Sequence, residues 1–253
     1  MLETETEVTY DNNNNQQDLV HKISQFHPLD VNENSYHPEI KKAKEWRDDI
    51  NTLQADGWFH QIEKYDPNFT GYVWRLCDNW MDILDVTEYS ERPIRYLEIG
   101  TLCGANLISV CKTYASHPDS ILECIDIWED TDEYSEYKYL QTSNYNHFLA
   151  NVYRNGLEGR TIAHKDYSYR VFPMLENNVY DIIYIDANHE SWAVLEDGVH
   201  AFRKCKPDGW IIFDDYTFSE ETQRGIDSFL NCFNGYISEY YIEHGQCYVR
   251  LSK

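Results

Sequence analysis

The chain has 253 residues, of which 42% are hydrophobic, and this length is enough to bury one substantial α/β core. Its formal net charge is −23, from 44 acidic against 21 basic residues. Because affinity for nucleic acid and for anionic membranes depends on Lys and Arg, we expect neither as a partner. A small molecule or a protein is the expected partner.

The seven cysteines form no C-x-x-C pair and stand mostly in apolar surroundings, which is typical of a reducing compartment. The sequence has no apolar run long enough to cross a bilayer, and its first residues lack the basic start of a signal peptide. We therefore expect a soluble, intracellular, cytoplasmic protein, and assembly into a homo-oligomer stays open.

The first part of the chain differs in composition from the rest. Residues 1–35 are acidic and Asn-rich, with too little apolar surface to offset the entropy of ordering, and they are predicted to be a disordered tail. Residues 36–92 are predicted to form a helical extension that packs on the core or roofs a cleft. Two sets of apolar residues recur there at helical spacing: Ile40, Ala43, Trp46, Ile50 and Leu53, then Val73, Leu76, Trp80, Ile83 and Leu84.

From residue 93 onward, short apolar runs alternate with amphipathic stretches. The runs 95–99, 122–127, 161–164, 180–185 and 210–213 are predicted strands, and the alternation predicts a parallel sheet with helices on both faces. The last two runs, 236–242 and 246–251, are joined by only three residues and require an antiparallel hairpin. Residues 93–253 are thus predicted to be one α/β domain with a seven-stranded, mostly parallel sheet.

The first predicted strand leads into the sequence LEIGTLCGAN, from Leu97 to Asn106. Gly100 allows a sharp turn and close approach of a ligand, and Gly104 opens the next helix. The Gly-x-x-x-Gly spacing differs from the dinucleotide fingerprint, which argues against a dehydrogenase. Glu98 suits an amine-bearing ligand better than a phosphate. The alternative is a glycine turn that serves only strand–helix packing.

Acids also follow the next two predicted strands, at Asp126 and Asp166. Together with Glu98 they place three carboxylates at the sheet edge where such folds bind ligands. In these features, residues 93–252 resemble the Rossmann-like class I S-adenosylmethionine-dependent methyltransferases. The resemblance implies that Gly100 and Gly104 face the methionine part of the cofactor, with Glu98 beside them. It also implies that Asp126 holds the ribose and that Asp166 meets the adenine.

A second group of acids follows the fourth and fifth predicted strands. Asp186 ends one strand, and the pair Asp214 and Asp215 ends the next. Three crowded carboxylates repel one another unless a cation lies between them, and Mg²⁺ or Ca²⁺ is the usual partner of oxygen ligands. The sequence therefore predicts a divalent metal site.

This second pattern resembles the metal-dependent O-methyltransferases, both the catechol type and the macrocin O-methyltransferase-like enzymes of macrolide and aminocoumarin sugars. The resemblance implies that Asp186, Asp214 and Asp215 hold Mg²⁺ against the acceptor hydroxyl, with Asp186 also counted as catalytic. His189, three residues beyond Asp186, is implied as the base. The Asp-x-x-His spacing and the double Asp favour the sugar branch, with a sugar or sugar nucleotide as acceptor.

A neutral imidazole can remove the proton of a metal-activated hydroxyl, whereas a structural hydrogen bond is the alternative role for His189. Residues 128–144 are predicted to form a lid, and Trp192 and Tyr216 to line the acceptor pocket. Two other functions stay open. One is a metal-independent methyltransferase that acts on a carboxyl, amine or phenol, and the other is a non-catalytic cofactor-binding or scaffold protein.

Overall fold

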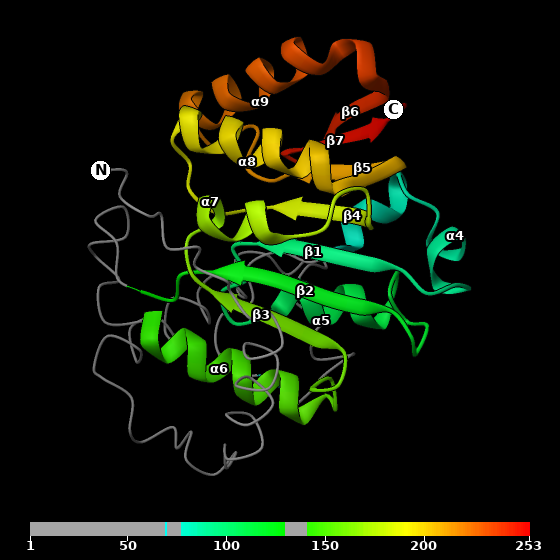
Figure 1. Ribbon diagram of the computed structural model, residues 1–253, viewed down its shortest axis with the longest axis vertical. Helices are drawn as coiled ribbons and strands as arrows, with labels where there is room; N and C mark the ends of the chain where they lie inside the picture. The colour runs from blue at the N-terminus through cyan, green and yellow to red at the C-terminus, as the bar shows by residue number, and fades with distance from the viewer. Residues whose placement is uncertain (1–68, 70–76, 130–140) are drawn as a thin grey trace, which may run out of the picture.

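The structure is a computed structural model that describes residue 69 and residues 77–129 and 141–253 (Figure 1). The predicted tail, 1–35, and most of the predicted extension, 36–92, lie outside the described residues. Within the described part, no helix combines the length and the apolar character needed to cross a membrane.

Seven strands form a single sheet in the order β3-β2-β1-β4-β5-β7-β6 within the described residues. The pairs β3-β2, β2-β1, β1-β4 and β4-β5 are parallel, and β5-β7 and β7-β6 are antiparallel. The predicted seven-stranded, mostly parallel sheet with its C-terminal antiparallel hairpin is therefore confirmed. The strands are β1 (Arg95–Ile99), β2 (Ile121–Asp126), β3 (Thr161–Lys165), β4 (Tyr180–Ile185), β5 (Cys205–Phe213), β6 (Ile237–Glu243) and β7 (Gln246–Leu251).

Strand β5 begins earlier than the sequence predicts. Tyr180 pairs with Cys205 and Ile182 pairs with Trp210, so one residue of β4 stands opposite the four residues 206–209 of β5. Asp208 has a φ of +60° within this segment. Residues 206–209 therefore form a bulge inside the strand, because residue 205 already pairs with β4 before the predicted start of the strand at residue 210.

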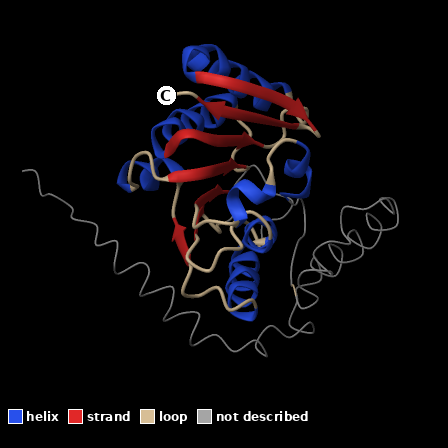
Figure 2. Ribbon diagram, turned by 90° about the vertical axis from the view of Figure 1, so that its right-hand side faces the viewer, coloured by secondary structure: helices blue, strands red, loops and turns tan. Residues whose placement is uncertain are grey.

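Helices cover both faces of the sheet (Figure 2). The α-helices are α4 (Val86–Ser90), α5 (Ala105–Lys112), α6 (Gln141–Arg154), α7 (Ser168–Val171), α8 (Ser191–Lys204) and α9 (Glu220–Phe233). Short 3-10 helices are η3 (Cys77–Asp82), η5 (Phe172–Met174) and η6 (Asn234–Tyr236).

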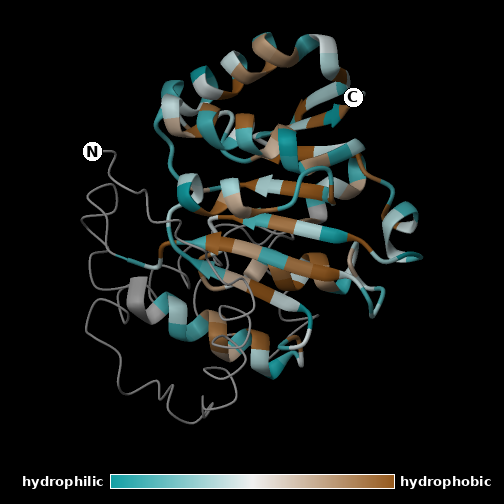
Figure 3. Ribbon diagram, in the orientation of Figure 1, coloured by the Kyte–Doolittle hydropathy of each residue, from teal (hydrophilic) through white to brown (hydrophobic). Residues whose placement is uncertain are grey.

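The core consists of two hydrophobic clusters, one on each side of the sheet. Successive strand residues point to opposite faces, so Tyr96 enters the cluster with α5 and α6, and Leu97 enters the cluster with α8 and α9. The central strands are accordingly apolar over most of their length (Figure 3). Trp80 of η3 is fully buried in the first cluster, so the described end of the predicted extension packs directly on the sheet.

Candidate active site

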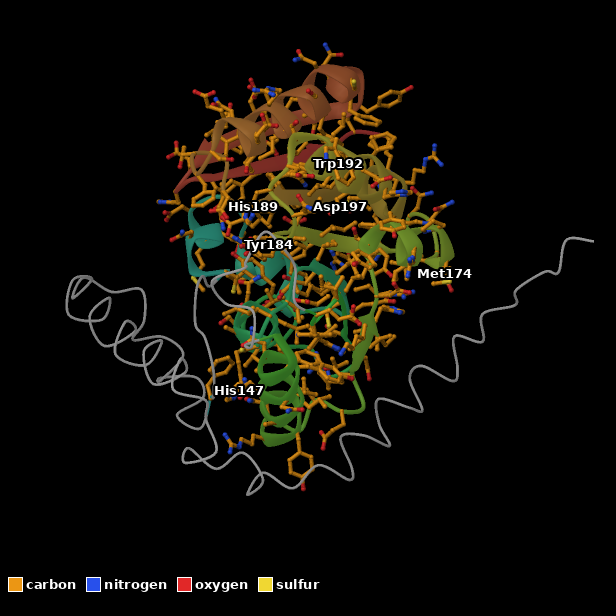
Figure 4. The ribbon with its side chains drawn as sticks, turned by 90° about the vertical axis from the view of Figure 1, so that its left-hand side faces the viewer. His147, Met174, Tyr184, His189, Trp192 and Asp197 are labelled. Carbon is orange, nitrogen blue, oxygen red and sulfur yellow. The ribbon has the colours of Figure 1, made fainter. Side chains whose placement is uncertain are left out.

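The carboxyl ends of the parallel strands meet at one edge of the sheet. The arrowheads of β1, β2 and β4 point to this edge in Figure 1, and Figure 4 views the molecule from that side. We call this edge the carboxyl rim. In open α/β sheets ligands bind at this position.

The loop from Gly100 to Gly104 starts at the carboxyl end of β1. Both glycines have positive φ, +83° and +82°. A Cβ on Gly100 would lie 1.7 Å from the backbone oxygen of Asp186, so only glycine fits against the end of β4. The loop that is predicted to face the cofactor and the first of the predicted metal acids are therefore in direct contact.

The Asp126 carboxylate holds the backbone of the same loop. Its carboxylate accepts the N–H groups of Thr101 at 2.9 Å and Leu102 at 2.8 Å, and on its other oxygen that of Trp128 at 2.8 Å. Burial raises the pKa of Asp126, and these three hydrogen bonds oppose the rise. A carboxylate has about four acceptor positions, so capacity for a further donor such as a ribose hydroxyl remains.

Glu98 lies beneath the loop, only 1% exposed. Its carboxyl oxygens accept hydrogen bonds from the hydroxyls of Tyr96 and Thr101 and from the amide of Asn106 at 3.2 Å. Burial raises its pKa to about 7, although these hydrogen bonds act in the opposite direction. The structure thus shows Glu98 as an internal anchor of the loop.

Asp166 stands at the carboxyl rim after β3. Its carboxylate accepts the N–H of Tyr167 at 2.8 Å and pairs with Arg170 at 3.2 Å. The side chain is about one-third exposed, so it remains accessible to a ligand at this rim.

Three predicted catalytic or metal-binding residues come together at the rim beside the glycine loop. Ligand atoms of Asp186, His189 and Asp215 all lie within 4.8 Å of one another. The His189 Nε2 and Asp215 Oδ2 atoms are 3.0 Å apart. Asp215 has a φ of +57°, an uncommon conformation for a residue other than glycine, and it follows the end of β5. Two carboxylates and an imidazole are a donor set that fits a divalent cation.

Asp214 does not join this group, because its side chain points into the protein. It is only 4% exposed and accepts hydrogen bonds from the Tyr184 hydroxyl at 2.7 Å and the Gln246 amide at 3.1 Å. The Tyr184 hydroxyl also lies 3.5 Å from Asp186 Oδ2, and the backbone N–H of Asp215 donates to Asp214 at 2.8 Å. Asp214 and Tyr184 therefore form a buried layer beneath Asp186 and Asp215.

Three residues of this region, Tyr184, Phe218 and Gln246, have no role in the sequence prediction. Tyr184 of β4 lies two residues before Asp186, which directly follows the strand, so the strand period alone places both side chains on one face. Phe218 lies between β5 and α9, its ring centroid 5.4 Å from that of His189, and a large aromatic in a polar loop beside the acids was the available signal. Gln246 gave no signal, because nothing in its local sequence indicates a distant aspartate.

The aromatic residues predicted at this rim have different surroundings. Trp192 is 61% exposed at the start of α8, whereas the Tyr216 hydroxyl donates to Asp227 of α9 at 2.9 Å. Trp128, the first residue of the predicted lid, is fully buried and donates from its indole to the Leu102 carbonyl at 2.7 Å. Residues 130–140 of the predicted lid lie outside the described residues.

Three further histidines have structural surroundings. His164 contacts Glu123 at 2.8 Å inside the sheet, and His200 stacks on Phe172 with ring centroids 5.3 Å apart. Burial lowers the pKa of His147 on α6 to about 4, which keeps its imidazole neutral. Six of the seven cysteines are buried, in agreement with their apolar sequence surroundings.

Comparisons with known proteins agree with this architecture. A family model described as a methyltransferase domain matches residues 97–216, the part of the chain that carries the glycine loop and the acids. No curated protein matches the sequence. This match supports a methyltransferase of the class that uses S-adenosylmethionine.

Solved structures are similar in fold. A putative caffeoyl-CoA O-methyltransferase from Staphylococcus aureus has 14% identity and a TM-score of 0.54, over 83% of this chain and 99% of that one. An O-methyltransferase from Bacillus cereus in complex with SAH has 14% identity and a TM-score of 0.54, over 80% and 97%. MycE of the mycinamycin biosynthetic pathway, in complex with Mg and SAH, has 13% identity and a TM-score of 0.50. That match covers 77% of this chain but only 54% of MycE, about half its length.

Proposed function

We propose that the protein is an S-adenosylmethionine-dependent O-methyltransferase that uses a divalent cation and methylates a hydroxyl of a sugar or sugar-bearing small molecule. One observation carries the proposal: Gly100 packs so closely on the Asp186 backbone that the cofactor loop and the group of Asp186, His189 and Asp215 form one continuous rim. A donor beside the loop and an acceptor beside the acids would then be neighbours, which is the arrangement that methyl transfer requires.

The cofactor side of the proposal rests on Asp126 and the loop that it holds. Asp126 fixes the Thr101 and Leu102 backbone, so the loop is already ordered before a ligand arrives. Asp126 is proposed to receive the ribose hydroxyls, and Asp166 to meet the adenine at the next strand end. Gly104 caps α5, and its φ of +82° forms the turn of the loop that is proposed to face the methionine part. Glu98 is proposed to contribute from beneath, by anchoring Thr101.

The acceptor side rests on Asp186, Asp215 and His189. We assign Asp186 and Asp215 as metal ligands, and Asp214, predicted as a third ligand, as the buried carboxylate that braces them. A divalent cation supplies a lowered pKa and a fixed position for the bound hydroxyl. The structure of MycE, which has a similar fold, was solved with Mg, so Mg²⁺ is the first cation to test.

We propose that His189 removes the proton of the hydroxyl. A carboxylate cannot donate a hydrogen bond, so in the neutral imidazole the Nε2–H donates to Asp215 and the lone pair is on Nδ1. Asp215 thereby orients the ring and stabilises the imidazolium that forms. The Nδ1 atom is the proposed proton acceptor.

Two measurements on the His189→Ala variant test this assignment. As a base, His189 is needed for turnover but not for binding Mn²⁺ or S-adenosylmethionine, so both dissociation constants stay unchanged while turnover falls at least about a hundredfold. A parallel loss of Mn²⁺ affinity would instead make His189 a metal ligand. His200→Ala, which removes a histidine stacked on Phe172, is the matched control.

The metal and the acceptor are tested by transfer of a labelled methyl group to a panel of methyl glycosides, with and without EDTA. The proposal expects labelled product that disappears on chelation and returns with Mg²⁺. Turnover that survives EDTA would favour the metal-independent alternative. Calorimetry that detects no binding of S-adenosylmethionine would favour the scaffold alternative.

A further inference from the structure

The two most exposed large apolar side chains among the described residues come from the two segments that follow His189 and Asp215. Phe218 is 69% exposed, and Trp192 is 61% exposed. Trp192 belongs to the first turn of α8, three residues after His189, and Figure 4 labels both at the carboxyl rim. Single exposed apolar residues are ordinary, but one in each of the two segments that carry His189 and Asp215 indicates a ligand surface.

Local hydrogen bonds hold the Trp192 indole and the backbone of Phe218. The Trp192 indole donates to Glu190 Oε2 at 2.6 Å, and the Phe218 backbone N–H donates to the Asp215 carbonyl at 2.9 Å. The first turn of α9 is tied to the same loop, because the Thr222 hydroxyl lies 3.4 Å from the His189 carbonyl. A ligand that binds here loses little free energy to the ordering of the Trp192 indole and of the loop that carries Phe218.

Each ring is also accompanied by a carboxylate. Glu190 contacts the Trp192 indole, and Asp215 contacts His189, whose ring packs on Phe218. Aromatic faces beside carboxylates attract organic cations, because the ring quadrupole and the negative charge act together. The basic residue of α9, Arg224, is already paired with Glu221 at 2.7 Å.

We propose that Trp192 and Phe218 form a platform for a cyclic acceptor that carries a protonated amine, with its hydroxyl directed to the Asp186–His189–Asp215 group. This inference rests on the proposed function for the hydroxyl and adds the charge and shape of the molecule that bears it. It disfavours phosphate-bearing sugar nucleotides, because their charge would face Glu190 and Asp215.

Saturation-transfer NMR on the EDTA-treated protein tests the platform with three cyclohexanol probes of similar size. These are trans-4-aminocyclohexanol, cyclohexane-1,4-diol and 4-hydroxycyclohexanecarboxylate, which are cationic, neutral and anionic. The amine probe is expected to bind about twofold to thirtyfold more tightly than the diol, the range of a cation–π contact, and the carboxylate probe most weakly.

Phe218→Ala and Trp192→Ala should each remove the preference for the amine. Tyr240→Ala, which removes a 54% exposed aromatic from β6, should leave it unchanged. Equal binding of amine and diol would overturn the proposal. So would an amine preference that persists in both platform variants, since the amine would then simply replace a metal ion at Asp186 and Asp215.

The experiment needs neither S-adenosylmethionine nor turnover, so its outcome is separate from that of the proposed function. Methyl transfer without an amine preference would overturn the platform alone. Equal melting temperatures of the variants and the parent protein would show that loss of binding is local.

Discussion

Glu98 gives a prediction whose size follows from its surroundings. It is 1% exposed, and burial raises its pKa from the usual 4.5 to about 7. The folded protein therefore holds this proton between about pH 4.5 and pH 7, where the unfolded chain releases it, and the free energy of unfolding falls as the pH rises through that window. The shift in pKa corresponds to a loss of about 3 kcal/mol in the free energy of unfolding, and this loss is complete above about pH 7.

Glu98→Gln removes the ionisation and keeps the shape. The Asn106 side-chain oxygen has no hydrogen-bond partner, so a rotated Asn106 amide can accept from the new glutamine. We compare the free energies of unfolding of the variant and the parent, from urea unfolding followed by circular dichroism. The difference in favour of the variant should be about 2 to 3 kcal/mol larger at about pH 8 than at about pH 5.

Glu123→Gln is the matched control on the neighbouring strand. Glu123 is 3% exposed, and although burial alone raises its pKa, contacts with His164, Tyr180 and Arg95 lower it overall. Glu123 therefore contributes stability at neutral pH that is lost as the pH falls, and Glu123→Gln should destabilise the protein at about pH 8. A Glu98→Gln effect that does not change between the two pH values would refute the reasoning.

Three further substitutions test the rim. Gly100→Ala places a Cβ 1.7 Å from a carbonyl oxygen and should lower the free energy of unfolding, measured by thermal unfolding, by more than about 3 kcal/mol. Gly156 also has a positive φ but has open space around it, so Gly156→Ala should cost about 1 kcal/mol. Equal costs would contradict the close contact. Tyr184→Phe should weaken Mn²⁺ binding, measured by EPR, about tenfold to a hundredfold. Tyr241→Phe, which loses a surface hydrogen bond, should not weaken it. Unchanged Mn²⁺ affinity in Tyr184→Phe would show that Tyr184 does not brace the metal ligands. Asp126→Asn should raise the dissociation constant of S-adenosylmethionine at least about tenfold by calorimetry, and an unchanged constant would exclude Asp126 from the cofactor site.

The apolar runs, and the lengths of the segments that connect them, were enough to predict the strands of the sheet and their parallel or antiparallel pairing. A strand that is covered on both faces is apolar over most of its length, as in Tyr180–Ile185, where Asp181 is the exception and pairs with Arg92 and Lys206. Its carboxyl end and the acid that follows it can therefore be located from sequence. The contact between Asp186, His189 and Asp215 follows from two such strand ends lying side by side.

The details of the two aspartates could not be predicted in the same way. Asp214 points inward because Tyr184 and Gln246 donate to it, and Gln246 comes from β7, far along the chain. Asp215 turns to the rim through a φ of +57°, a backbone choice that the sequence pattern does not reveal. The inward role of Glu98 likewise depends on Tyr96 and on tertiary contacts with the helix that follows.

The central claim is that the methyl donor and the Asp186–His189–Asp215 group share one rim, and a paramagnetic ion tests it directly. Mn²⁺ should broaden the methyl resonance of bound S-adenosylmethionine strongly in the parent protein, and Asp186→Ala should abolish the effect while the cofactor still binds. A methyl resonance that Mn²⁺ leaves sharp, in protein shown to bind both, would contradict the account.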